Sequence, residues 1–139
     1  MIPFVLDTDM LTLFQDGHPA VVAQVVTRSR TELAVTVVGA EEQLSGWYTR
    51  LRRAKKRDEL ARVYGRMAAS LESLAHFQIL PFTEPAILRY EQLLSLKLGV
   101  GAMDLRIAAT VLEHGGTFVT RNKRDFQRVP GLQFVDWSI

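Results

Sequence analysis

The 139-residue sequence contains no cysteine, which excludes both a disulfide framework and a thiolate metal site. It also has no apolar run long enough to span a bilayer. No basic segment precedes the first apolar run, so the N-terminus does not resemble a signal peptide. Neither sign of charge dominates, because 17 Lys and Arg residues stand against 15 Asp and Glu residues. These absences predict a cytoplasmic protein without disulfides.

Short apolar runs alternate with amphipathic helix patterns along the whole chain. The hydrophobic share of 47% is sufficient for a core, and 139 residues is a usual size for one domain. The runs typical of buried strands are 2–6, 33–38, 77–82, 117–120 and, more briefly, 133–137. The helix patterns are 10–14, about 20–28, 41–51, 60–74, 86–98 and 103–112. This alternation predicts an α/β fold in a single domain over 1–139, with a mostly parallel sheet of four to five strands and helices on both faces.

Four acidic residues lie where predicted strands end or helices begin. Asp7 follows the first run, Glu42 follows the second, Asp104 opens a helix pattern, and Asp125 follows the fourth run after two turn residues. The carboxyl ends of parallel strands share one edge, where ligands bind. Four carboxylates gathered there repel one another, which makes physical sense mainly as a divalent-metal site. Taken singly, each acid is equally well explained as a helix N-cap or a surface charge, so only their joint placement favours the metal.

The local strings around these acids resemble those of the PIN-domain nucleases, and among them the VapC-like toxins of prokaryotic toxin–antitoxin pairs. The strings are Val-Leu-Asp-Thr-Asp (5–9), Glu-Glu-Gln-Leu-Ser-Gly (41–46), Asp-Leu-Arg-Ile-Ala-Ala (104–109) and Phe-Val-Thr-Arg-Asn-Lys-Arg-Asp-Phe (118–126). With Val-Pro-Gly-Leu (129–132), they cover the whole chain in order. The resemblance implies an endoribonuclease that depends on Mg²⁺ or Mn²⁺, is commonly a homodimer, and is inhibited by a small antitoxin.

The same resemblance places the family's metal-binding acids on Asp7, Glu42, Asp104 and Asp125. Glu42 is preferred to Glu41 because the family's glycine lies four residues after its glutamate, as Gly46 does here. Mg²⁺ needs only one or two direct carboxylates, so the others can hold a second ion or orient water. Whether one ion or two bind is left open.

Three further polar residues are candidates for a supporting role. Asn122 and Thr120 match polar positions of the last string and are candidates to hydrogen-bond the carboxylates or the scissile phosphate. They are also explained as a turn asparagine and a strand-end threonine. Asp9 stands where the family more often has asparagine, so it either strengthens metal binding or caps the helix.

Basic residues are concentrated in two segments, 50–57 and 121–128. An acidic metal cluster repels RNA unless cations flank it, so these segments are candidates for phosphate binding. Arg121, Lys123 and Arg124 are the first choice because they adjoin Asp125. The candidates from the other segment are Arg52 and Arg53. That segment is equally typical of a solvated helix face.

Two aromatic residues, Trp47 and Tyr48, lie between Glu42 and the basic run. They are candidates to stack on a base or to join a partner interface. Packing in the core explains them at least as well.

Two other functions remain open at this stage. A strand followed by Asp7-Thr8-Asp9 also resembles the start of a HAD-type phosphatase, in which Asp7 would be the covalent nucleophile. That chemistry needs a downstream lysine and a paired acidic motif, but Lys97 and Lys123 are poorly placed and no Asp-Asp pair follows. A non-catalytic PIN-fold interaction module is the other alternative, and the complete set of acids gives it little support.

Overall fold

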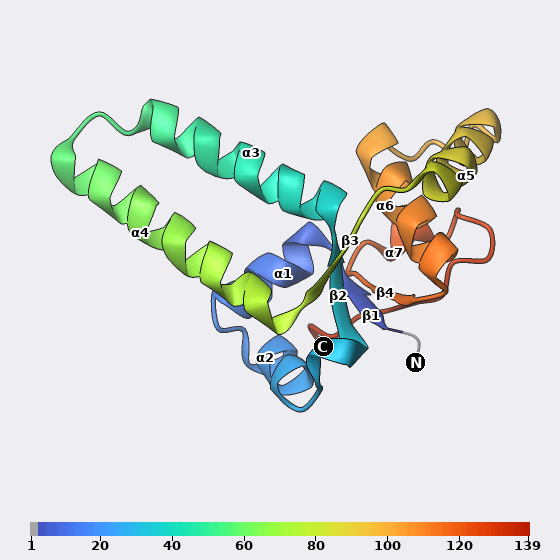
Figure 1. The fold of residues 1–139 in the computed structure, drawn as a ribbon, viewed down its shortest axis with the longest axis horizontal. Helices are drawn as coiled ribbons and strands as arrows, with labels where there is room; N and C mark the ends of the chain where they lie inside the picture. The colour runs from blue at the N-terminus through green and yellow to red at the C-terminus, as the bar shows by residue number, and fades with distance from the viewer. Residues whose placement is uncertain (1–2) are drawn as a thin grey trace.

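The computed structural model describes residues 3–139, and within them five strands form one sheet (Figure 1). The strands are β1 (Phe4–Leu6), β2 (Leu33–Thr36), β3 (Gln78–Leu80), β4 (Thr117–Val119) and β5 (Phe134–Val135). Their order is β3-β2-β1-β4-β5, and every neighbouring pair is parallel. The predicted α/β fold with a parallel sheet is therefore confirmed. The predicted start of the first strand at Ile2 lies outside the described residues.

Helices cover both faces of the sheet, as predicted. They are α1 (Thr8–Gln15), α2 (Pro19–Val26), α3 (Val37–Arg53), α4 (Arg57–Ser73), α5 (Glu84–Ser95), α6 (Ala102–His114) and α7 (Lys123–Phe126), with 3₁₀ turns η1 (Arg30–Glu32) and η2 (Leu74–His76). Successive side chains of a strand point to opposite faces. Val5 accordingly packs with α5 and α6 in one hydrophobic cluster, whereas Leu6 packs with α1 and α2 in the other. No helix within residues 3–139 is both long and apolar enough to cross a bilayer.

Several elements differ from the sequence prediction in their bounds, and side-chain caps explain two of these differences. The second strand ends at Thr36 rather than residue 38, because the backbone N–H of Gly39 donates to Thr36 Oγ1 at 2.9 Å and begins α3 there. Asn122, which the sequence analysis also explained as a turn residue, caps the short helix α7, and that helix was not predicted. Asp125 therefore lies within a helix.

The hairpin of α3 and α4 extends away from the sheet, with α1 beside its base (Figure 1). Trp47 of α3 is only 7% exposed, and its indole N–H donates to Ser70 Oγ of α4 at 3.3 Å. Of the two interpretations of Trp47, packing is therefore confirmed, and a role in base stacking or partner contact is excluded because the side chain is buried within the hairpin. Tyr48 is exposed and remains a candidate.

Helix α4 does not bury the apolar face that its sequence pattern predicts. Leu60, Tyr64 and Leu71 are exposed, whereas the buried residue of this helix is Ser70. The Ser70 hydroxyl donates to Gln43 at 2.9 Å and accepts from Gln15 at 3.2 Å. A polar network from α1, α3 and α4 thus holds the base of the hairpin in place of an apolar contact.

Candidate active site

The first acid, Asp7, lies immediately after β1 and caps α1. Its carboxylate accepts the backbone N–H of Met10 at 2.6 Å. It also accepts a hydrogen bond from the hydroxyl of Thr120, a fully buried residue after β4. Because β1 and β4 are neighbouring strands, the sheet itself brings these two residues together.

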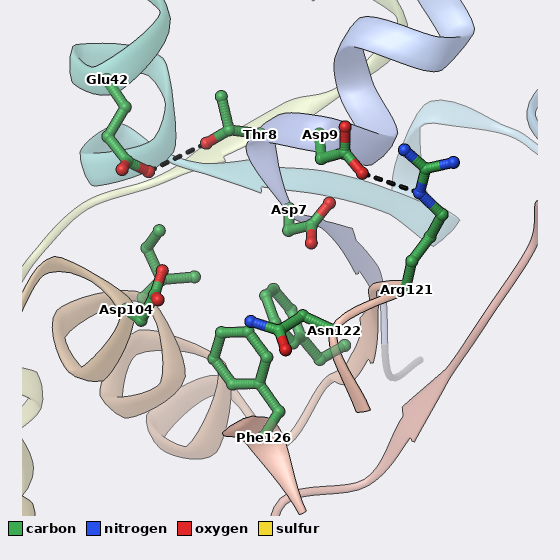
Figure 2. Close-up of a pocket in the computed structure, with 10 residues that line it drawn as sticks. Asp7, Thr8, Asp9, Glu42, Asp104, Arg121, Asn122 and Phe126 are labelled. Atoms are coloured by element: carbon green, nitrogen blue, oxygen red, sulfur yellow. Dashed lines mark hydrogen bonds and ion pairs between the residues drawn. The ribbon is translucent and has the colours of Figure 1, made fainter. Parts of the chain in front are cut away.

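Glu42 and Asp104 reach the same place from two other helices. Glu42 lies in the second turn of α3, and its Oε1 accepts a hydrogen bond from the Thr8 hydroxyl at 2.9 Å. Asp104 lies in the first turn of α6. Figure 2 shows these side chains around one pocket of about 340 Å³. Its lining is Asp7, Thr8, Asp9, Glu42, Asp104, Ile107, Phe118, Arg121, Asn122 and Phe126.

The fourth predicted acid, Asp125, lies just outside this lining, behind Asn122. The Asn122 amide donates to Asp125 Oδ2 at 3.0 Å, and the Asn122 oxygen caps the Asp125 backbone N–H at 3.3 Å. The charge of Asp125 nevertheless reaches the pocket, since it raises the pKa of Asp104. Three of the four predicted acids therefore line the pocket directly, and the fourth lies adjacent to it.

Burial and mutual repulsion make the pocket a poor place for uncompensated negative charge. Burial is the main reason that the pKa of Asp7 is raised to about 6, and the negative charges of Asp9 and Asp104 raise it further. The hydrogen bonds from Thr120 and Met10 lower the pKa but do not outweigh these effects. Burial is also the main cause of the raised pKa values of Glu42 and Asp104. The charge of Asp104 adds to the rise at Glu42. A cation in the pocket would offset these costs.

The donor set fits a hard divalent cation that keeps part of its water shell. No group of three or more His, Asp or Glu side chains within residues 3–139 is arranged to hold one ion in common. Mg²⁺ does not require such a cage, because it commonly binds one or two carboxylates and several waters. The pocket offers only oxygen ligands, and its half-buried carboxylates repel one another. Mg²⁺ and Mn²⁺ prefer such oxygen ligands, so either ion fits this site.

The raised pKa of Asp7 leads to a prediction for the metal-free protein. The folded state binds this proton more tightly than the unfolded state, where the pKa is near 3.9. The resulting stability is fully present below that value and is lost as pH rises through about 6. We expect the free energy of unfolding in EDTA to fall by up to about 3 kcal/mol across this window.

Urea unfolding measured at several pH values in EDTA tests this expectation. Asp7→Asn should flatten the dependence on pH, since asparagine does not titrate there. A wild-type stability that rises with pH between 4 and 6 would contradict it.

Of the basic residues next to Asp125 in the sequence, Arg121 lines the pocket and is paired with an acid. Arg121 Nε donates to Asp9 Oδ2 at 2.9 Å, and both side chains are about half exposed. Asp9 is thus an ion-pair partner at the rim of the pocket. Burial raises the pKa of Asp136, but hydrogen bonds from Ser138 and the positive charges of Lys123 and Arg121 outweigh it and lower the pKa overall. Lys123 therefore also lies near an acid. Arg124 is exposed.

The two candidates from the other basic segment lie on the hairpin, away from the acids. Arg52 lines a separate groove on α3 together with Glu41 and Tyr48. Arg53 lies at the end of α3, near the tip of the hairpin. Neither lines the pocket of the acids.

Sequence reasoning missed two features of the site. The first is Thr8, whose hydroxyl donates a hydrogen bond to Glu42. The only indication of this residue in the sequence is that it belongs to the string Val-Leu-Asp-Thr-Asp (5–9). Arg66 of α4 lies with Arg50 over the ring of Trp47, beside the acid pocket. Nothing in the sequence around Arg66 indicates this position, because it depends on how α4 folds back against α3.

The fold and the acid-lined pocket agree with a comparison to known families. A family model described as PIN domain matches residues 4–132. The chain therefore belongs to the PIN-domain family. This assignment removes the HAD-type alternative.

Among individual proteins, the chain is similar to ribonuclease VapC1 of Rickettsia felis, with 34% identity over 66 residues. The match covers 45% of this chain and 49% of that relative, so the chain spans about half of its length.

Two solved structures show the same fold at low sequence identity. A chain of DNA-bound VapBC from Salmonella typhimurium has a TM-score of 0.80 at 22% identity, covering 99% of both chains. A chain of VapBC-1 from nontypeable Haemophilus influenzae has a TM-score of 0.78 at 22% identity, covering 100% of both.

Proposed function

We propose that this protein is an endoribonuclease that depends on Mg²⁺ or Mn²⁺ and acts as the toxin of a toxin–antitoxin pair. The main support is the pocket lined by Asp7, Glu42 and Asp104, in which the pKa of each acid is raised. The similarity to a protein named ribonuclease VapC1 supports RNA as the substrate class. A PIN-fold module without catalysis would not need this concentration of half-buried negative charge.

In this proposal the four acids bind the metal either directly or through its water shell, and the surrounding polar groups fix their positions. Thr120 and the N–H of Met10 orient Asp7, whereas Thr8 orients Glu42. Asn122 orients Asp125, and its amide lies at the pocket wall beside the space for a scissile phosphate. A bound Mg²⁺ or Mn²⁺ ion would activate a water and neutralise charge that develops on the phosphoryl oxygens.

The proposed partners are a small antitoxin and a second copy of the chain. One similar solved structure is described as a toxin–antitoxin complex from Klebsiella pneumoniae, with a TM-score of 0.69 at 21% identity. An inserted Arg or Lys of an antitoxin would pair strongly with the half-buried acids. Tyr48 is exposed and shares a groove with Val37 and Leu44, so these residues could make the apolar contact with the antitoxin. Trp47 cannot make this contact because it is buried.

Cleavage assays with and without metal test the enzymatic part of the proposal. We expect labelled RNA to be cut in Mg²⁺ or Mn²⁺ and cleavage to stop in EDTA, because the acids alone repel the phosphate. The phosphatase substrate p-nitrophenyl phosphate serves as a control and should not be hydrolysed. Undiminished RNA cleavage in excess chelator would reject the metal assignment.

The basic residues next to Asp125 make a separate prediction about RNA binding. We expect Lys123→Ala with Arg124→Ala to weaken RNA binding and to reduce its salt dependence by roughly one to two counterions. Affinity measured over a series of salt concentrations gives this slope. An unchanged slope would show that these residues do not contact phosphate, and the hairpin residues would then be the better candidates.

A further inference from the structure

A groove runs from the acid pocket along the inner side of the hairpin. It has a volume of about 250 Å³ and lies between α1, α3 and α4. Thr8 and Glu42 line both this groove and the acid pocket, so the two adjoin on either side of the hydrogen bond between these residues. At its far end, Arg50 also lines a further hollow of about 450 Å³ near the tip of the hairpin. These neighbouring hollows therefore follow one another from the acids outward along α3 and α4, and we refer to them as the track. Figure 1 shows the hairpin that these two helices form.

Two arginines are held over one rigid support in this groove. The Cζ atoms of Arg50 and Arg66 lie 4.8 Å and 5.5 Å from the ring of Trp47. Trp47 is itself buried and anchored to Ser70, which belongs to the polar network with Gln15. Stacking uses the flat face of a guanidinium and leaves the N–H groups at its edge available for an anion.

The groove itself sets Arg50 and Arg66 against Asp16 and Glu42, and cations are in excess in the outer hollow. Arg66 lies 3.8 Å from Asp16, but both side chains are more than half exposed, and such pairs contribute little and exchange readily. Two guanidiniums on one indole repel each other unless an anion joins them. The outer hollow adds Arg53, Lys56 and Arg62, opposed by Asp58 and Glu59. Phosphate groups of a nucleic-acid strand would satisfy these cations in succession.

We infer that this groove holds the RNA backbone that flanks the scissile phosphate, with Arg50 and Arg66 as the phosphate contacts nearest to the acids. The inference rests on the proposed function, and it adds where the substrate lies. The strand enters the acid pocket past Thr8 and Glu42 and runs outward between α3 and α4. Because Trp47 is covered, the contact is with the backbone and not with a base, so it gives affinity without sequence preference.

The experiment measures binding of a short, unstructured oligouridylate to Asp7→Asn protein, in which cleavage is prevented. Each of Arg50→Gln and Arg66→Gln should lower the slope of log affinity against log salt by about 0.7, and the double variant by about 1.4. Between 50 and 200 mM salt, the loss of affinity should then be about sevenfold smaller for the double variant than for the parent. Arg30→Gln is the matched control, because Arg30 is exposed in η1, at the opposite end of β2 from the pocket. It should leave the slope unchanged.

Fluorescence provides a second measurement that does not depend on these variants. The chain has two tryptophans, so Trp137→Phe leaves Trp47 as the sole reporter. Saturating oligouridylate should change the emission of Trp47, because phosphate binding shifts the arginines stacked on its ring. If the emission of Trp47 does not change at saturating oligouridylate, the inference is wrong.

The remaining outcomes separate this inference from the proposed function. If wild-type protein cleaves RNA and Lys123→Ala with Arg124→Ala lowers the salt slope, but the folded groove double variant does not, the groove inference alone is wrong. If the groove variant loses binding to the protein of an adjacent small gene but not to RNA, the groove belongs to that partner and the inference is also wrong. Absence of any metal-dependent RNA cleavage by wild type would instead reject the proposed function.

Discussion

We expect Asp7→Asn to reduce RNA cleavage by at least about a thousandfold while the protein stays folded. The substitution would remove a negative charge that the proposed metal ion requires. A loss of about 4 kcal/mol in transition-state stabilisation corresponds to that factor in rate. The fold survives because asparagine is as good an N-cap as aspartate and can still accept the Met10 N–H. Single-turnover cleavage of labelled RNA at saturating Mg²⁺ gives the rate.

The thermal midpoint of the same variant without metal is the first control. It should stay level or rise, because a charge with a raised pKa has been removed from a half-buried site. A large fall would show that Asp7 is structural.

A second control uses two neighbouring glutamates of α3. Glu42→Gln should lose activity, whereas Glu41→Gln should retain it, because Glu41 is exposed and lines a different groove. Equal losses in the two variants would show that the choice between these glutamates is wrong.

We expect expression of this chain alone to arrest growth of its native host or a close relative, because an unrestrained ribonuclease would degrade the RNA of its own cell. Asp7→Asn should abolish the arrest, and so should co-expression of the small protein of an adjacent gene. Colony counts after induction, with immunoblots for the accumulated protein, measure the effect. Unimpaired growth of cells that accumulate wild-type protein without a partner would reject the toxin role but would leave the nuclease chemistry standing.

The sheet edge that carries the acids could be predicted from the sequence because strand ends and helix starts have local signals. Asp7 follows an apolar run and caps a helix, and Asp104 opens an amphipathic pattern, so both positions follow from short-range chemistry. The boundary between β2 and α3 was less predictable. Two successive valines favour a strand, but the Thr36 cap begins the helix before them. That boundary sets where Glu42 lies on α3.

The interactions around the acids depend on residues that are distant in sequence. The ion pair of Asp9 with Arg121 joins residues 112 positions apart, and no local pattern indicates it. Likewise, the burial of Trp47 requires Ser70 of α4 to accept its N–H. A helix pattern shows which residues share a face, but not whether another element covers that face. This explains why Leu60, Tyr64 and Leu71 are exposed despite their periodicity.

The order of strands in the sheet also bears on when the pocket comes into existence during synthesis. β1 emerges first from the ribosome, yet its two neighbours are β2 and the much later β4. Thr120, which holds Asp7, follows β4, so the nascent chain cannot complete the pocket until this segment has been translated. Long-range parallel pairing is also slow to form. The acid pocket therefore remains incomplete through most of translation. Under the proposed function, this interval would let a partner already present in the cell bind the chain before it can cut RNA.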